Sequence, residues 1–217
     1  MKSFKLGLMF LALTSAGSML RADDAKGKCP GTCASDSSTC SVTAGMAKLP
    51  AMAYLVGEES LCCEESAKSA AAAAKTKLVY VVGKEKFDCP DMAFESLVDQ
   101  TEKYVSAFAT PSTCSVSGAT TVAGESMTCS VKAGEVADKV KFAMATVAIA
   151  YKVGDKSCSC PVEAKALAAS SKGKTLFVVD NEETECEQTA RLNLARAKYK
   201  AALIAMAPPA KTETKVN

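Results

Sequence analysis

The 217-residue sequence contains no histidine and no tryptophan, and only 5 tyrosines and 7 phenylalanines. The lack of histidine excludes Ser-His and Cys-His nucleophile pairs, His-ligated zinc sites and a proximal histidine on haem. The phosphate-binding patterns G-x-x-x-x-G-K and G-x-G-x-x-G and the hydrolase pattern G-x-S-x-G are absent as well. With so few aromatic residues, a sugar-binding cleft is not expected either. We therefore expect a protein that is not an enzyme.

The first 22 residues are typical of a secretory signal peptide. Lys2 and Lys5 provide a basic start, residues 6–13 form a short apolar segment, and residues 16–18 are small residues that suit cleavage. The apolar segment is too short for a membrane-spanning helix, which needs about 20 apolar residues. We expect cleavage between positions 18 and 22, and export to the periplasm or the extracellular space.

Neither charge sign dominates the sequence. It has 26 Lys and Arg and 24 Asp and Glu; without Lys2, Lys5 and Arg21 of the signal peptide, 23 basic and 24 acidic residues remain, a net charge near −1. Such a balance argues against binding to nucleic acid.

The sequence repeats itself at two offsets. Residues 53–89 match residues 150–186 at an offset of 97 without a gap, and a second offset of 26 relates two copies inside each half. The shared unit is aromatic-x-Val-(Gly/Asp)-x5-Cys-x3-Ala. It occurs four times, with its cysteine at Cys63, Cys89, Cys160 and Cys186.

The order of residues in this unit predicts a β-hairpin followed by a helix. An aromatic residue and a valine at alternate positions suit a strand, and Gly57, Gly83 and Gly154 suit a tight turn with positive φ. The proline or glutamate that follows each cysteine is typical of the first position of a helix. Each cysteine should therefore lie at a helix N-terminus.

These patterns predict an α+β protein of two duplicated lobes, each of two β-hairpin plus helix units. A stretch rich in Ser, Thr and Gly separates the halves, and an amphipathic helix follows it. The expected organisation is a signal peptide (1–22), a cysteine-containing flexible lead-in (23–50), a first lobe (51–110), a linker (111–128), a second lobe with a leading helix (129–206) and a disordered tail (207–217).

All 11 cysteines lie in the part expected to be exported, where disulfides form readily. We predict that Cys63 pairs with Cys89 and Cys160 with Cys186, because a pseudo-twofold axis between paired repeats brings equivalent positions together. The alternative is that these cysteines are thiolates, with pKa values lowered by the helix N-termini, that hold a soft metal or exchange disulfides.

The unit resembles the YHS/TRASH group of small metal-associated modules. The similarity rests on Cys40-Ser-Val-Thr-Ala-Gly, Tyr54-x-Val-Gly and Cys62-Cys63, with residues 86–104 similar to a second module. Cys40 and Cys62 keep the spacing between that group's first two metal ligands, whereas its last cysteine is replaced here by Ser66 or Ala67. A weaker resemblance links Met127-Thr128-Cys129 and the helix after it to heavy-metal-associated domains.

The metal site that this resemblance implies would use Cys40, Cys62 and Cys63. Cys158 and Cys160 are further candidate ligands, because two sulfurs on one side of a strand end can chelate zinc or copper. We expect an exported, disulfide-stapled repeat protein that binds a soft metal or a protein partner. The alternative is a thiol-disulfide oxidoreductase or redox buffer that uses Cys62, Cys63, Cys158 and Cys160.

Overall fold

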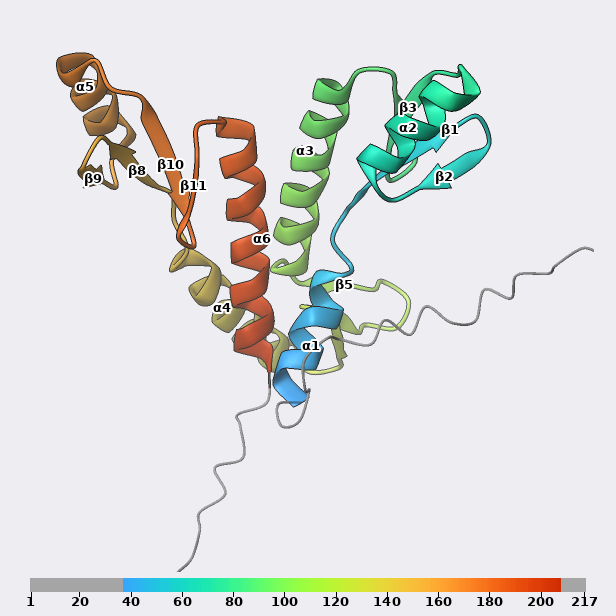
Figure 1. Ribbon diagram of the computed structural model, residues 1–217. Coiled ribbons are helices and arrows are strands. Elements are labelled where there is room, and N and C mark those ends of the chain that lie inside the picture. Colours follow the sequence, from blue (N-terminus) through green and yellow to red (C-terminus); the bar gives the residue numbers. More distant parts are fainter. Residues whose placement is uncertain (1–36, 208–217) are drawn as a thin grey trace, which may run out of the picture. The chain divides into compact units, whose positions relative to one another are not determined.

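The computed structural model describes residues 37–207, without the side chains of residues 37–40. The expected signal peptide (1–22), the first part of the lead-in and the tail beyond Ala207 lie outside the described residues. Half of the described residues are helical and 23% are in strands, which confirms the predicted α+β class. Figure 1 shows the six described helices and the small antiparallel sheets between them.

One ββα unit, a two-stranded hairpin followed by a helix, occurs five times in the described residues. The units are β1 (Met52–Val56), β2 (Glu59–Leu61) and α2 (Glu64–Ala74); β3 (Leu78–Val82), β4 (Glu85–Phe87) and α3 (Pro90–Phe108); β6 (Thr120–Val122), β7 (Glu125–Met127) and α4 (Ser130–Ala145); β8 (Ala150–Val153), β9 (Lys156–Cys158) and α5 (Pro161–Ser171); and β10 (Thr175–Val179), β11 (Glu182–Thr184) and α6 (Glu187–Met206). Two further elements are α1 (Ser37–Met46) and β5 (Ser112–Thr113).

The third unit lies where we predicted a linker, at 111–128. β6 pairs with both β5 and β7 to make a three-stranded sheet, so the prediction of a linker is wrong. Thr120 replaces the aromatic residue of the other units, and its hydroxyl lies 2.9 Å from that of Thr113. Ala123 replaces the turn glycine, with φ 53°. Because of these two replacements, the third unit does not match the sequence pattern of the other four. The predicted leading helix is present as α4.

Neighbouring units pair through their first strands. In the first four-stranded sheet the order is β2-β1-β3-β4, and in the second it is β11-β10-β8-β9. Tyr54 lies directly opposite Tyr80, and Tyr151 directly opposite Phe177, so equivalent aromatic residues meet across each pair. The ring centroids are 5.7 Å apart in both cases. Each pair of units is therefore related by a local pseudo-twofold axis.

The hairpin turns have the predicted geometry. Gly57, Gly83 and Gly154 have φ of 63°, 59° and 59°, and each opens a two-residue loop between paired strand ends. In the last unit Asp180 and Asn181 take φ of 49° and 69° instead. The loops with one positive φ and those with two match the hairpin turn types that fit twisted strands.

Each helix begins directly after the cysteine of its unit, as predicted. The cysteine is the N-cap residue with extended backbone in all five units. Proline occupies the first turn of α3 and α5, where its missing N–H has no partner to lose. The alanine four residues after each cysteine is at most 1% exposed, so each helix lies close to its own hairpin; these alanines are Ala67, Ala93, Ala133, Ala164 and Ala190.

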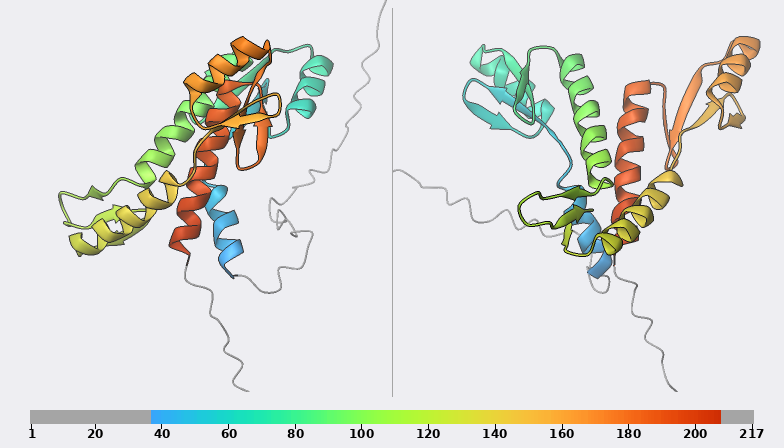
Figure 2. Two further views of the ribbon diagram at one scale, coloured as in Figure 1. Left: turned by 90° about the vertical axis from the view of Figure 1, so that its left-hand side faces the viewer. Right: turned by 180° about the vertical axis from the view of Figure 1, so that it is seen from behind.

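The two halves of the sequence share a core, because α6 packs against α3 and α4 (Figures 1 and 2). Tyr199 of α6 is 1% exposed and forms one cluster with Val105 of α3 and Ala195. The rings of Tyr104 and Phe108 meet Tyr199 edge to face, with centroids 5.5 and 4.9 Å away. The described residues belong to one compact unit rather than to two separate lobes.

Part of the expected flexible lead-in is helical. Residues 37–46 form α1, which packs against α6, and Met46 and Leu49 join the cluster around Tyr199. The helices approach closely at Gly45, where an added Cβ would lie 2.5 Å from Leu203 Cδ1. Small size at position 45 thus permits this contact, which the sequence pattern did not indicate.

Hydropathy along the described helices reveals none with the length and apolar character that crossing a membrane requires.

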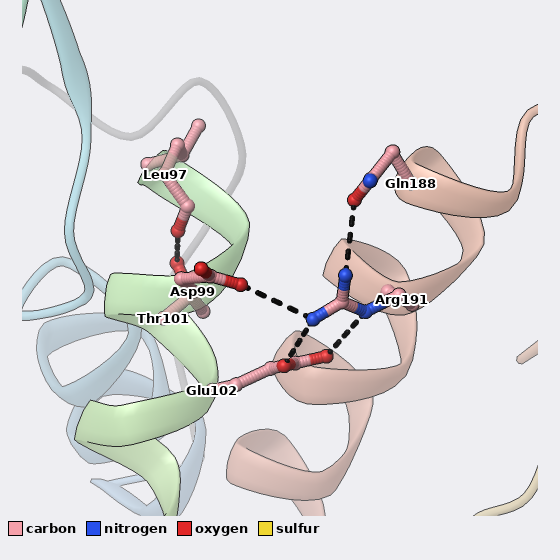
Figure 3. A network of polar contacts seen from close by, with 6 residues as sticks. All are labelled: Leu97, Asp99, Thr101, Glu102, Gln188 and Arg191. Carbon is pink, nitrogen blue, oxygen red and sulfur yellow. Dashed lines mark hydrogen bonds and ion pairs between the residues drawn. The ribbon is translucent and has the colours of Figure 1, made fainter. Parts of the chain in front are cut away.

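Arg191 links α6 to α3 through a polar network (Figure 3). Its Nε and Nη2 donate to the two carboxylate oxygens of Glu102 at 3.0 and 2.6 Å. Nη2 also donates to Asp99 Oδ1 at 3.2 Å, and Nη1 donates to Gln188 Oε1 at 3.2 Å. The carboxylate of Glu102 raises the pKa of Arg191. Such two-point contacts fix orientation as well as distance between two helices.

Backbone strain at the turn glycines is testable with a matched pair of substitutions. We expect Gly57→Ala to lower the free energy of unfolding by about 1 kcal/mol, because only the positive φ opposes a side chain there. Gly134→Ala, in the interior of α4 with open space around the added Cβ, should raise it by up to about 1 kcal/mol. Urea unfolding of both variants measures the difference; equal effects would refute the turn assignment.

The Arg191 network predicts a selective loss of stability. Arg191→Met should cost about 1 kcal/mol, because the two-point contact to Glu102 is lost at a site that is one-third exposed. The control is Arg196→Met on the same helix, since Arg196 is exposed and has no ion pair with the described residues. The control should stay within about 0.5 kcal/mol of the parent. A thermal melt in which both variants lose the same stability contradicts a specific role for Arg191.

Candidate functional site

The only chemically reactive side chain common to all five units is the cysteine at the start of the helix. Four of the five are exposed and one, Cys89, is half-buried; the exposed ones are Cys63, Cys129, Cys160 and Cys186. The backbone of each of these cysteines is extended, and the alanine one turn later is buried against the core. The fold therefore presents the same thiol position five times.

None of these thiols caps its own helix with a side-chain hydrogen bond. Polar groups of the first turn nevertheless favour the thiolate in two units. The backbone amide and hydroxyl of Ser66 lower the pKa of the Cys63 thiol, and the hydroxyl and amide of Thr189 do the same for Cys186. The first of these units has the sequence Cys-x-x-Ser and the second has Cys-x-x-Thr, so that the hydroxyl belongs to the third residue of the helix.

Two stretches hold a pair of neighbouring cysteines. Cys62 and Cys63 are both exposed, directly before α2. Cys158, the last residue of β9, is half-buried, and its Sγ lies 3.7 Å from the carbonyl oxygen of Cys160. Partial burial and the charge of Glu163 raise the pKa of the Cys158 thiol. In this second pair, the two positions lie on the same side of an extended segment.

Cys114, outside the repeated units, is a further thiol with a lowered pKa. The hydroxyl and backbone amide of Ser117 and the amide of Val116 lower it to about 7. The turn is held by a 2.9 Å hydrogen bond from the Gly118 amide to the Cys114 carbonyl. The sequence pattern gave no sign of this thiol, because Cys114 lies in the stretch interpreted as a linker.

The structure does not bring the predicted disulfide partners together. Cys63 follows β2 and Cys89 follows β4, the two outer strands of one sheet, with β1 and β3 between them. Three strand spacings amount to about 14 Å, twice the longest Cα separation that a disulfide bridges. Cys160 and Cys186 follow the outer strands of the second sheet in the same way. The residues that meet near the pseudo-twofold axis are the aromatic residues instead. All eight cysteines with described side chains are free.

The candidate metal ligands are likewise separate. Among the described side chains, three or more cysteine, aspartate or glutamate residues nowhere gather in a way that would hold a metal ion. Cys62 and Cys63 belong to one half of the sequence, and Cys158 and Cys160 to the other. The side chain of Cys40 lies outside the description, as do Cys29 and Cys33. The two cysteine pairs therefore remain two-ligand sites.

Cys129 is a unit cysteine that the repeat pattern missed. It aligns with Cys63 at an offset of 66, and Ala133 then aligns with Ala67. A search that required only Val-x6-Cys-x3-Ala would have found this copy at Val122. The pattern that required an aromatic residue and a glycine excluded this copy. Here Thr120, hydrogen-bonded to Thr113, occupies the aromatic position, and Ala123 with positive φ occupies the glycine position.

Comparison of the chain with protein-family models, with curated proteins and with solved structures finds no match.

Proposed function

We propose that the chain is an exported, non-enzymatic repeat protein that binds a protein partner through the thiols displayed on its ββα units. The observation that carries this proposal is the repetition: cysteine occupies the N-cap in five units out of five, exposed in four of them. A buried structural cysteine would be expected against the core, as the neighbouring alanine is. Exposure at the same position in different sequence contexts favours contact with another molecule.

The chemistry that fits this display is thiol-disulfide exchange with a disulfide of the partner. The cysteine thiolate attacks one partner sulfur, a new S–S bond forms, and the partner's other sulfur leaves as a thiolate that takes up a proton. The reaction needs no oxidant other than the partner's disulfide. The unit cysteines follow the outer strands of their sheets, so none of them lies beside another. At Cys89, Cys129 and Cys186 no neighbouring cysteine precedes the helix, so a mixed disulfide there has no adjacent thiol to resolve it and persists.

Two other ligands or activities rest on the neighbouring cysteines. A soft metal such as zinc or copper would use Cys158 with Cys160 or Cys62 with Cys63, and a partner would have to supply further ligands. A redox buffer or oxidoreductase would use the same pairs as a dithiol. Neither pair has the Cys-x-x-Cys spacing, so covalent capture of a partner is favoured over turnover.

The proposal predicts persistent mixed disulfides. When the reduced mature chain is treated with glutathione disulfide and its mass is mapped by peptide, we expect glutathione on Cys63 and Cys186 before Cys89, whose site lacks the hydroxyl. Ser66→Ala should slow the modification of Cys63 roughly threefold through loss of thiolate, and leave Cys186 unchanged. Thr189→Ala is the reciprocal control.

Two outcomes would contradict covalent capture. One is rapid loss of glutathione with formation of a disulfide inside the chain, and the other is catalytic reduction of insulin by the mature chain in the presence of dithiothreitol. Either would establish the redox activity instead, and Cys62→Ser and Cys158→Ser would then identify the responsible pair.

A pH profile tests the polar control of these thiols at Cys114. A lowered pKa means that the thiolate is present at lower pH, so alkylation of Cys114 should rise with a midpoint near pH 7. Ser117→Ala removes the hydroxyl that stabilises the thiolate and should move the midpoint upward, whereas Ser115→Ala should not. A midpoint that is the same in all three proteins contradicts the assignment.

A further inference from the structure

Among the described residues, helices cover one face of the first four-stranded sheet and leave the other face without a helix. Core clusters with α2 and α3 take their β1 and β3 side chains from alternate positions; these are Met52, Tyr54, Val56, Leu78, Tyr80 and Val82. The intervening residues Ala53, Leu55, Val79 and Val81 lie on the opposite face. They are half-buried, and none belongs to a core cluster of the described residues.

The strand register makes these four side chains one apolar patch, which we call the open face. Leu55 lies opposite Val79, and Ala53 lies opposite Val81. Lys86 of β4 lies opposite Val81 and so borders the patch. Asp88, two residues further along, borders the same face and forms a 2.7 Å ion pair with Lys77.

The duplicated sheet provides an internal comparison. At the position equivalent to Leu55 it has Lys152, and at the position equivalent to Lys86 it has Glu183. These two residues form a 2.7 Å ion pair across the corresponding face. One copy of the sheet thus covers its helix-free face with an ion pair, whereas the other leaves it apolar.

We infer that the open face is a contact surface for the open face of a second copy of this chain. Charge complementarity identifies the arrangement. Four directly opposite residues form one row across the four strands: Leu61, Tyr54, Tyr80 and Phe87. We place a twofold axis parallel to this row, between the two sheets. In each strand, the residue one position before the row then lies opposite the residue one position after the row in the same strand of the second copy.

In this arrangement Lys86 faces Asp88 of the second copy, and the same ion pair forms twice because the contact is symmetric. The apolar residues meet in the same way, Val81 against Val79 and Leu55 against Ala53. Two sheets packed face to face, about 10 Å apart, accommodate such contacts. In the second sheet Ala150, Leu176 and Val178 occupy the corresponding positions, but Lys152, paired with Glu183, replaces the leucine.

The size of the patch sets the strength of the contact. Four apolar side chains and a small rim are far fewer than the roughly 20–30 residues per partner in a stable interface. We therefore expect a weak dimer that forms at high protein concentration, with a dissociation constant on the order of 100 µM. This contact uses no thiol chemistry and so goes beyond the proposed function.

Sedimentation equilibrium of the mature chain tests the inference, with reductant present to exclude disulfide-linked species. The mean mass should rise toward that of a dimer between about 10 µM and about 1 mM. Leu55→Lys, which copies the duplicated sheet, should weaken association at least tenfold. Leu176→Lys, the same type of change on the other sheet's helix-free face, should leave association unchanged.

A charge exchange gives a second test that does not depend on the folding of Leu55→Lys. Lys86→Asp alone should weaken the dimer, because two carboxylates then face each other, and adding Asp88→Lys should restore it. A parent chain that stays monomeric at about 1 mM, or a Leu55→Lys variant that folds and still associates like the parent, overturns the inference. So does a double variant that associates no better than Lys86→Asp.

Discussion

The close contact between the valine of the first strand and the alanine in the first helical turn determines the form of each unit. In three units these two residues fall in one buried cluster, and all five alanines are essentially inaccessible to solvent. An alanine here lets the helix lie on its hairpin at short distance, and a larger side chain would push the helix outward. The cysteine lies one turn before the alanine, between the second strand and the helix. The contact between valine and alanine therefore fixes the position of the cysteine at the edge of the unit.

Units pair because each of them is too small to bury its apolar face alone. A hairpin of five and three residues cannot bury an apolar face alone, but two hairpins joined through their first strands form a sheet with two helices on one side. The third unit lacks an aromatic residue and a paired neighbour, and the two-residue β5 pairs with its first strand instead. The long helices α3 and α6 then connect the sheets, with Tyr199 buried between them and Arg191 fixing their orientation. Thiol display and the open face are both consequences of how few residues each unit buries.

Local features were predictable from the sequence, and long-range ones were not. The turn at Gly57 and the helix start after Cys63 follow from residue types within ten positions, and both are confirmed. The core around Tyr199 depends on residues about 95 positions apart, whose apolar spacing does not reveal which helix they meet. For the site, the sequence identified four of the five unit cysteines but not their separation. Equivalent positions approach a pseudo-twofold axis only when they lie on its central strands, as Tyr54 and Tyr80 do; the cysteines follow the outer strands.

The central claim is that the fold keeps the unit cysteines apart and available. Peptide mapping of the untreated mature protein, alkylated on isolation and digested without reduction, tests it most directly. We expect Cys63, Cys89, Cys160 and Cys186 each to be recovered either free or joined to another molecule. Recovery of Cys63 joined to Cys89, or of Cys160 joined to Cys186, within a single chain would contradict it.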